Sequence, residues 1–212
     1  MTPRAILFDW DNTLAEGWAA VAAALNAVFH RRAMKPWTAE QTRARVRGSA
    51  RDCFPALFGT GWEDDLALFY ATLRRDHLAH LRAMPGAADL LDACRHLPLG
   101  VVSNKSGPVL RAEIAHLGWT ARFGAIVGAG DAVADKPDPA PARLALSQLG
   151  LSAGPEIWLV GDTAIDMQTA RACGCRAVLL GDAAHDGGTE RAAPDAHFPQ
   201  VADLIAYFAA LA

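Results

Sequence analysis

Five short runs of apolar residues along the chain predict buried β-strands. Each run is three or four residues long, shows no alternation of polar and apolar positions, and is followed directly by Gly, Ser or Asp. Such continuous runs are typical of a parallel sheet that helices cover on both faces. The predicted strands are Ala5–Phe8, Leu99–Val102, Ala125–Val127, Ile157–Val160 and Ala177–Leu180.

Helical patterns lie between these runs. Apolar residues there recur every three or four positions, as in Leu110, Ile114 and Leu117. The alternation of strand and helix predicts an α/β fold with a doubly wound parallel sheet of the Rossmann type.

The interval between the first two predicted strands is longer than one crossover helix requires. It carries helical periodicity, as in Trp18, Val21 and Leu25, and Thr38 with Gln41 forms a predicted capping box. We therefore predict an all-helical insert over residues 15–84, with the α/β core formed by residues 1–14 and 85–212.

Composition and charge exclude several classes of protein. The chain has 212 residues, of which 52% are hydrophobic, and 20 Lys and Arg balance 23 Asp and Glu for a net charge of −3. This balance gives no basic excess for nucleic acid binding. The apolar stretch Trp18–Phe29 is too short to span a bilayer, and the apolar run before Asp9 does not resemble a signal peptide. Four cysteines in a chain of this length do not indicate a disulfide scaffold, so we expect a cytoplasmic location.

Two carboxylates follow the first predicted strand, in the segment Asp9-Trp10-Asp11-Asn12-Thr13. Residues two apart on an extended segment share a face, so both carboxylates could reach one small site. Taken alone, the segment is equally consistent with an ordinary turn rich in Asp and Asn.

The ends of the other predicted strands favour a functional site. Ser103, Asn104 and Lys105 follow the second strand, Lys136 precedes Pro137, and Asp162 and Asp166 follow the fourth strand. In open α/β sheets these ends meet at one edge. Four carboxylates gathered there would repel one another strongly, and a hard cation with oxygen ligands, such as Mg²⁺, would resolve the conflict.

These four segments, in this order, resemble the motifs of the haloacid dehalogenase-like hydrolase superfamily, and the resemblance covers the whole chain. The helical insert resembles the cap of its phosphoglycolate-phosphatase-like branch. The resemblance implies a Mg²⁺-dependent phosphatase that hydrolyses a small organic phosphate monoester through an aspartyl-phosphate.

The resemblance also assigns a role to each motif residue. It implies that Asp9 is the nucleophile and Asp11 the general acid and base, and that Asp9, the backbone carbonyl of Asp11 and Asp162 bind Mg²⁺. Ser103 and Lys136 would hold the phosphoryl oxygens. Asp166 would orient waters or the neighbouring Lys. Thr13 and Asn104 are assigned to substrate binding, Thr13 by bracing the loop and Asn104 through its backbone amide.

Two residues in the first motif depart from the superfamily pattern. Asn12 stands where Gly is usual, and Asn tolerates a left-handed backbone better than most residues do. Trp10 stands where Phe or Leu is usual, and we expect it to pack in the core. The acid at Asp11 argues for phosphate esters, because the dehalogenases of this superfamily lack it.

The predicted insert has a charge of its own. Residues 15–83 contain 10 Lys and Arg and 7 Asp and Glu, a net of +3, which leaves −6 for the rest of the chain. A basic insert beside an acidic, metal-dependent core favours a small anionic phosphorylated metabolite as substrate. Arg47 and Arg51 resemble a cap segment that faces the active site, and we predict that they contact substrate. A solvated helix face explains them as well.

Other functions are also consistent with these residues. A phosphomutase would use the same residues. A phospho-acceptor domain or a binding protein without turnover would share the sheet, but phospho-acceptor domains place the accepting Asp after the third strand, where this chain has Gly128.

Overall fold

The computed structural model of the protein describes residues 2–46 and 50–211, apart from the side chains of Arg51 and Asp52. The chain forms two compact units. Residues 1–15 and 83–212 make up the first, here called the core unit, and residues 16–82 make up the second, the helical unit.

A parallel six-stranded sheet lies at the centre of the core unit, with the strand order β5-β4-β1-β6-β7-β8. The five predicted strands are all present, which confirms the predicted α/β fold. The sequence reading missed the sixth strand, β8, because this short edge strand contains an exposed His197 between two half-buried residues. The strands are β1 (Ala5–Phe8), β4 (Leu99–Ser106), β5 (Ala125–Ala129), β6 (Ile157–Gly161), β7 (Arg176–Leu180) and β8 (Ala196–Phe198).

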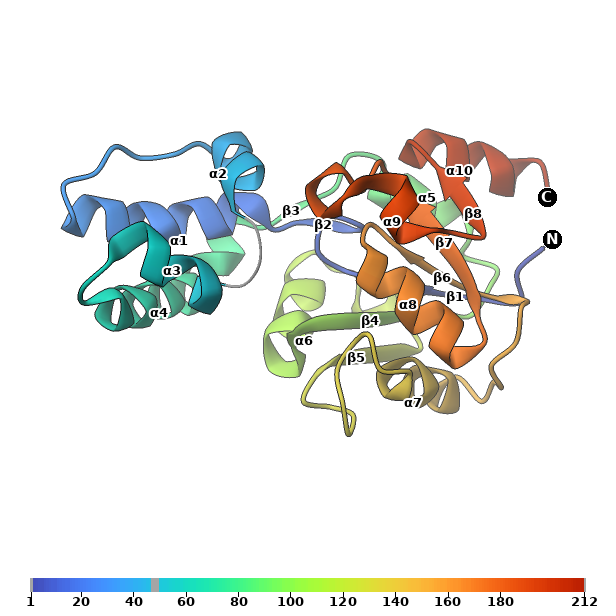
Figure 1. Ribbon diagram of the computed structural model, residues 1–212. Helices are drawn as coiled ribbons and strands as arrows, with labels where there is room; N and C mark the ends of the chain where they lie inside the picture. Colours follow the sequence, from blue (N-terminus) through green and yellow to red (C-terminus); the bar gives the residue numbers. More distant parts are fainter. Residues whose placement is uncertain (1, 47–49, 212) are drawn as a thin grey trace. The chain divides into compact units, whose positions relative to one another are not determined.

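Helices cover both faces of the sheet. Helices α7 (Ala140–Gln148) and α8 (Ala164–Cys173) pack on one face over a cluster of small and branched apolar side chains (Figure 1). Helices α5 (Ala87–Ala93) and α10 (Val201–Ala209) lie on the other face. Trp158 of β6 packs there against Tyr207 of α10, with ring centroids 5.3 Å apart and ring planes at 38°.

Helix α6 (Gly107–His116) connects β4 to β5 and packs against both strands. The short helix α9 (Gly188–Ala192) and two single-turn 3₁₀ segments, Thr120–Arg122 and Ala184–Asp186, complete the core unit.

The register of the sheet aligns the ends of its central strands. Phe8 at the end of β1 pairs with Val101 of β4 and with Val160 of β6. Because the strands are parallel, the residues that follow them leave the sheet at the same edge. The polar residues after β1 and β6 and at the end of β4 therefore come together.

The helical unit contains α1 (Trp18–Arg31), α2 (Ala39–Arg45), α3 (Ala50–Phe58) and α4 (Trp62–His80). Helices α1, α3 and α4 share an apolar cluster built largely from phenylalanine rings, including Phe29, Phe54, Phe58 and Phe69. The strands β2 (Ala15–Glu16) and β3 (Arg82–Ala83) form a separate two-stranded sheet.

Helix α2 begins where the sequence predicts. The hydroxyl of Thr38 accepts a hydrogen bond from the backbone N–H of Gln41 at 3.1 Å, and the side-chain oxygen of Gln41 accepts one from the backbone N–H of Thr38 at 3.1 Å. The predicted capping box is thus confirmed. Within the described residues, no helix is both long enough and apolar enough to cross a bilayer.

Candidate active site

Asp9 stands at the tip of β1, where its backbone N–H still bonds to the carbonyl of Val160 at 2.8 Å. Its carboxyl group is buried within the polar edge of the sheet. Burial raises the pKa of Asp9 to about 7, and the negative charge of Asp166 adds to this rise, whereas the Lys136 ammonium opposes it. The side chain therefore depends on nearby positive charge to stay ionised.

Lys136 supplies that charge. Its Nζ lies 2.6 Å from Oδ1 of Asp9 and 2.6 Å from Oδ1 of Asp166. Burial alone would lower the pKa of the Lys136 ammonium, but the two carboxylates outweigh burial and raise it. The amide side chain of Asn104 holds Lys136 in place by bonding to both its backbone N–H and its carbonyl, each at 2.9 Å.

Asp162 follows β6 and completes a cluster of three carboxylates. One oxygen from each of Asp9, Asp162 and Asp166 lies within 4.8 Å of the other two. Burial and the charge of Asp9 raise the pKa of Asp162. Its Oδ2 atom is buried and, among the described residues, has no hydrogen-bond partner, although Nε2 of His185 lies 3.3 Å away.

Both oxygens of Asp166 are already engaged. Oδ1 bonds to Lys136, and Oδ2 accepts bonds from the hydroxyl of Thr163 at 2.6 Å and from its backbone N–H at 3.1 Å. These last bonds cap the first turn of α8 and fix the carboxylate. Of the two acids after β6, Asp162 is therefore the one with an oxygen available to a cation.

The loop after Asp9 is held by its own backbone. The N–H groups of Leu14 and Ala15 both bond to the carbonyl of Trp10, at 3.0 and 2.9 Å. The hydroxyl of Thr13 lies 3.3 Å from Oδ2 of Asp9 and 3.5 Å from Oδ1 of Asp162. Asn12 has a φ of 62°, which confirms the expected left-handed backbone at this position.

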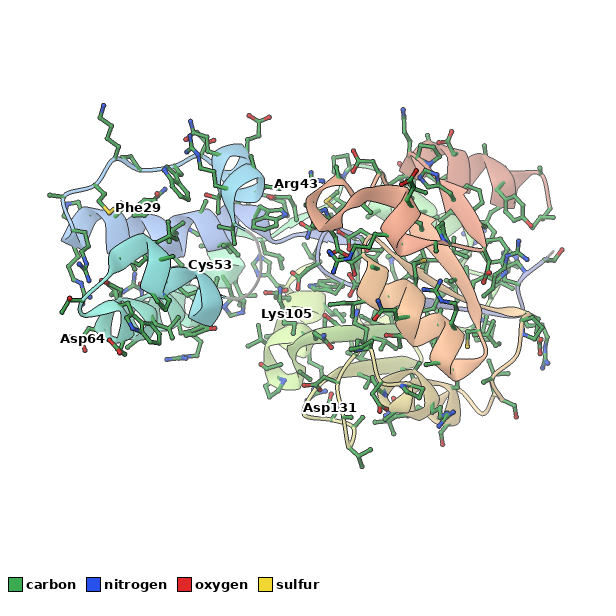
Figure 2. All side chains as sticks on the ribbon, viewed as in Figure 1. Phe29, Arg43, Cys53, Asp64, Lys105 and Asp131 are labelled. Atoms are coloured by element: carbon green, nitrogen blue, oxygen red, sulfur yellow. The ribbon has the colours of Figure 1, made fainter. Side chains whose placement is uncertain are left out.

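A second charged group lies beside the loop. Oδ1 of Asp11 bonds to Nζ of Lys105 at 2.7 Å, and the same Nζ lies 2.6 Å from Oε2 of Glu113 on α6. Figure 2 labels Lys105 near the end of β4. The indole N–H of Trp10 also donates to Oε2 of Glu113, at 2.7 Å. Trp10 is fully buried, as expected of a core residue, and it packs edge-on against Trp119.

The remaining predicted residues divide into two groups. Ser103 is buried at the end of β4, and its Oγ accepts a bond from the backbone N–H of Lys105 at 3.1 Å. Arg47 lies outside the described residues, and so does the side chain of Arg51, which leaves their predicted contact with substrate a prediction.

Sequence reasoning assigned no role to Lys105, Glu113 or His185. Lys105 directly follows Ser103 and Asn104, so its position was a usable signal. Glu113 occupies a position on the buried face of α6 with Leu110 and Ile114, where an acid is unexpected. His185 lies in the single-turn 3₁₀ segment Ala184–Asp186, where the sequence has no periodicity, and carried no signal.

Comparison with known proteins gives consistent matches over most of the chain. The family model for haloacid dehalogenase-like hydrolases matches residues 6–180. A phosphoglycolate phosphatase from Rhodospirillum rubrum is 34% identical over 194 residues, which cover 84% of this chain and 79% of the relative. An N-acetylmuramic acid 6-phosphate phosphatase from Pseudomonas aeruginosa is 31% identical over 189 residues, which cover 85% and 82%.

A solved structure matches at the level of the fold. A hydrolase from Geobacter sulfurreducens, described as belonging to the HAD superfamily, subfamily IA, variant 1, has a TM-score of 0.80 and 19% sequence identity. The match covers 97% of this chain and 96% of that one.

Proposed function

This chain belongs to the haloacid dehalogenase-like hydrolase family and is a phosphatase, and from that premise we propose that it hydrolyses a small organic phosphate monoester through an aspartyl-phosphate on Asp9. The observation that carries the proposal is the pairing of a buried Asp9 with Lys136 beside two further carboxylates. This arrangement gives a nucleophile, a fixed cation and a place for a metal ion within one small site.

The first step forms the phosphoenzyme. A carboxylate oxygen of Asp9 attacks phosphorus, the bond from phosphorus to the alcohol oxygen breaks, and Asp11 donates a proton to the departing alkoxide. Lys136 and the buried Ser103 hold the phosphoryl oxygens, and Lys136 also offsets the negative charge of Asp9.

The second step releases phosphate. Asp11, now a carboxylate, takes a proton from a water molecule as that water attacks phosphorus. The bond between phosphorus and Asp9 breaks, and both acids return to their starting states. No group is oxidised or reduced, so the cycle needs only water and the phosphate ester.

We assign Mg²⁺ binding to Asp9, Asp162 and the backbone carbonyl of Asp11. The fit rests on Oδ2 of Asp162, which accepts no hydrogen bond from the part of the chain that the structure describes, and on the closeness of that carboxylate to Asp9. When bound, Mg²⁺ supplies positive charge that stabilises the phosphoryl group in the transition state. We assign Asp166 a supporting role, because its carboxylate holds Lys136 and caps the first turn of α8 through Thr163.

The substrate we propose is a small anionic metabolite. The two relatives described above are phosphatases of phosphoglycolate and of N-acetylmuramic acid 6-phosphate, so both compounds belong in the first set of substrates tested. We further propose that the helical insert acts as a cap and that Arg47 and Arg51 contribute its positive charge. A cytoplasmic location accords with this role and remains a prediction.

The test is phosphate release by the wild-type protein and by Asp9→Asn. We expect Mg²⁺-dependent release from at least one small phosphate ester, loss of that release with EDTA, and a reduction of roughly 10⁴-fold or more in Asp9→Asn, because the nucleophile is gone. Asp89→Asn, which alters an exposed acid on α5, is the control and should retain activity. Full activity in Asp9→Asn would show that the nucleophile is misassigned.

A further inference from the structure

Glu113 is a buried acid that the proposed mechanism does not use. It lies on α6 among apolar residues and is only 2% exposed. Burying a carboxylate destabilises the folded state unless charged or polar partners compensate for the loss of water. Its partners therefore explain why an acid can occupy this position.

Both partners belong to the edge of the sheet that carries the active site. Oε2 of Glu113 accepts one bond from the indole N–H of Trp10 and one from Nζ of Lys105. Trp10 lies between Asp9 and Asp11 in the chain. Glu113 thus ties α6 to the loop that holds the proposed nucleophile and to the end of β4.

Lys105 is shared between two acids. Besides Glu113, its Nζ bonds to Oδ1 of Asp11 at 2.7 Å. The Nζ atom of Lys105 thus lies between two carboxylate oxygens, one from the loop after β1 and one from α6. Without Glu113, the side chain of Lys105 would lose one of the two bonds that fix its direction.

The bond to Lys105 also distinguishes the two oxygens of Asp11. An ammonium group only donates hydrogen bonds, so Oδ1 must accept. When Asp11 is protonated, its proton is therefore carried by Oδ2. The side chain of Asp11 is 36% exposed, unlike that of Asp9, so this group is not enclosed by the core.

We propose that Glu113 and Lys105 are positioning residues for proton transfer by Asp11. Glu113 holds Lys105, Lys105 holds Oδ1, and Oδ2 is left to give its proton to the alcohol oxygen as the bond from that oxygen to phosphorus breaks. Trp10 fixes the Glu113 carboxylate, which gives the unusual aromatic residue of the first motif a function besides packing. The inference rests on the proposed function.

The leaving group of the substrate provides a test. An alkyl phosphate, such as phosphoglycolate, needs a proton on its departing oxygen, whereas p-nitrophenyl phosphate releases a stable anion without one. The value of kcat/KM reports on formation of the phosphoenzyme for either ester. A loss confined to the alkyl ester therefore reports on proton donation, which a purely structural role of Glu113 would not affect selectively.

The variants are Glu113→Gln, which keeps the shape of the side chain and removes its charge, and Lys105→Met, which removes the bond to Asp11. We expect kcat/KM for the alkyl ester to fall about 10²-fold in each, with a change below about threefold for p-nitrophenyl phosphate. Lys105→Arg should recover part of the loss. Arg111→Gln is the control, because Arg111 lies on the same helix but pairs with Asp131 at the surface.

The possible results separate the two proposals. Equal losses for both esters, or no loss in either folded variant, would overturn the positioning role while leaving the proposed phosphatase mechanism intact. If Glu113→Gln fails to fold, as judged by thermal unfolding, Lys105→Met decides the question alone. Inactivity of the wild-type protein toward every ester, or full activity in Asp9→Asn, would instead reject the proposed function.

Discussion

At Asn12 the chain adopts a left-handed backbone in the turn that follows Asp9 and Asp11. This conformation costs most residues about 1–2 kcal/mol, and the cost is smaller for Asn and absent for Gly. The turn is otherwise held by backbone bonds to the carbonyl of Trp10. The conformation of one residue therefore contributes to the geometry of the whole site.

Substitutions at this position should follow backbone preference. We expect the free energy of unfolding of Asn12→Gly to lie within about 0.5 kcal/mol of the wild-type value. Asn12→Val should lower it by about 1–2 kcal/mol, because a β-branched side chain is strained at positive φ. Urea unfolding of both variants measures the difference. Equal stability of the two would mean that the turn is not constrained at Asn12.

Among the helices, the pair α1 and α4 is joined by a buried acid. Asp65 of α4 is completely buried and forms ion pairs with Arg31 and Arg32 at the end of α1. Arg32 also donates to the carbonyls of Phe58 and Thr60, at 3.1 and 2.9 Å. One carboxylate thus orders the end of α1, the end of α3 and the start of α4.

Removing the charge of Asp65 should destabilise the protein. Asp65→Asn weakens hydrogen bonds between charged groups, and each such bond contributes about 1.5–3 kcal/mol to stability. We therefore expect the free energy of unfolding, measured with urea, to fall by an amount of that order. Asp64→Asn is the matched control, because Asp64 is the exposed neighbour in the same turn of α4, and it should change stability by less than about 0.5 kcal/mol.

The ion pairs of Asp65 also predict how their contribution to stability depends on pH. Burial works to raise the pKa of Asp65, but the bonds and charges of Arg32 and Arg31 prevail and hold it below the ordinary value of 3.8. A carboxyl group whose pKa is lower in the folded state than in the unfolded state stabilises the folded protein at pH values above the pKa of the unfolded state. This contribution is lost as the pH falls through the pKa of the folded state. The difference between wild type and Asp65→Asn should therefore shrink below about pH 4. A constant difference would contradict the ionic explanation.

For the molecule as a whole, the sheet gathers acids that lie far apart in the sequence. Asp9, Asp162 and Asp166 converge at one edge, with Lys136 as the cation bonded to two of them. Such a cluster is electrostatically costly, and any ligand that binds only the folded state stabilises it.

Mg²⁺ should therefore raise the thermal unfolding temperature. At a Mg²⁺ concentration about 100 times its Kd, the folded state should be stabilised by about 2.7 kcal/mol, and EDTA should reverse this stabilisation. Asp162→Asn should lose the shift, because it removes a proposed ligand, whereas Asp89→Asn should keep it. A shift that persists undiminished in Asp162→Asn would place the ion elsewhere.

Local sequence was sufficient to predict five of the six strands of the central sheet, the presence of helices between the first two of those strands, and the acids at the strand ends. Each of these features depends on residues that are close together in the sequence, as an apolar run, a helical period or a short motif. Asn12 could be interpreted in the same way, because the left-handed preference belongs to the residue itself. The resemblance to a phosphatase family then followed from the order of the motifs.

Tertiary structure alone decided which side chains pair. Lys105 bonds to Asp11, which lies 94 positions away in the sequence, and Trp10 bonds to Glu113, which lies 103 positions away. Neither pairing can be predicted from the periodicity or the composition of the sequence. The same holds for the Asn104 amide on Lys136 and for His185 beside Asp162. The sequence by itself determined what chemistry the sheet edge carries. Packing of α6 and the loops determined how each acid there is held, because a hydrogen bond depends on distances that only the folded chain defines.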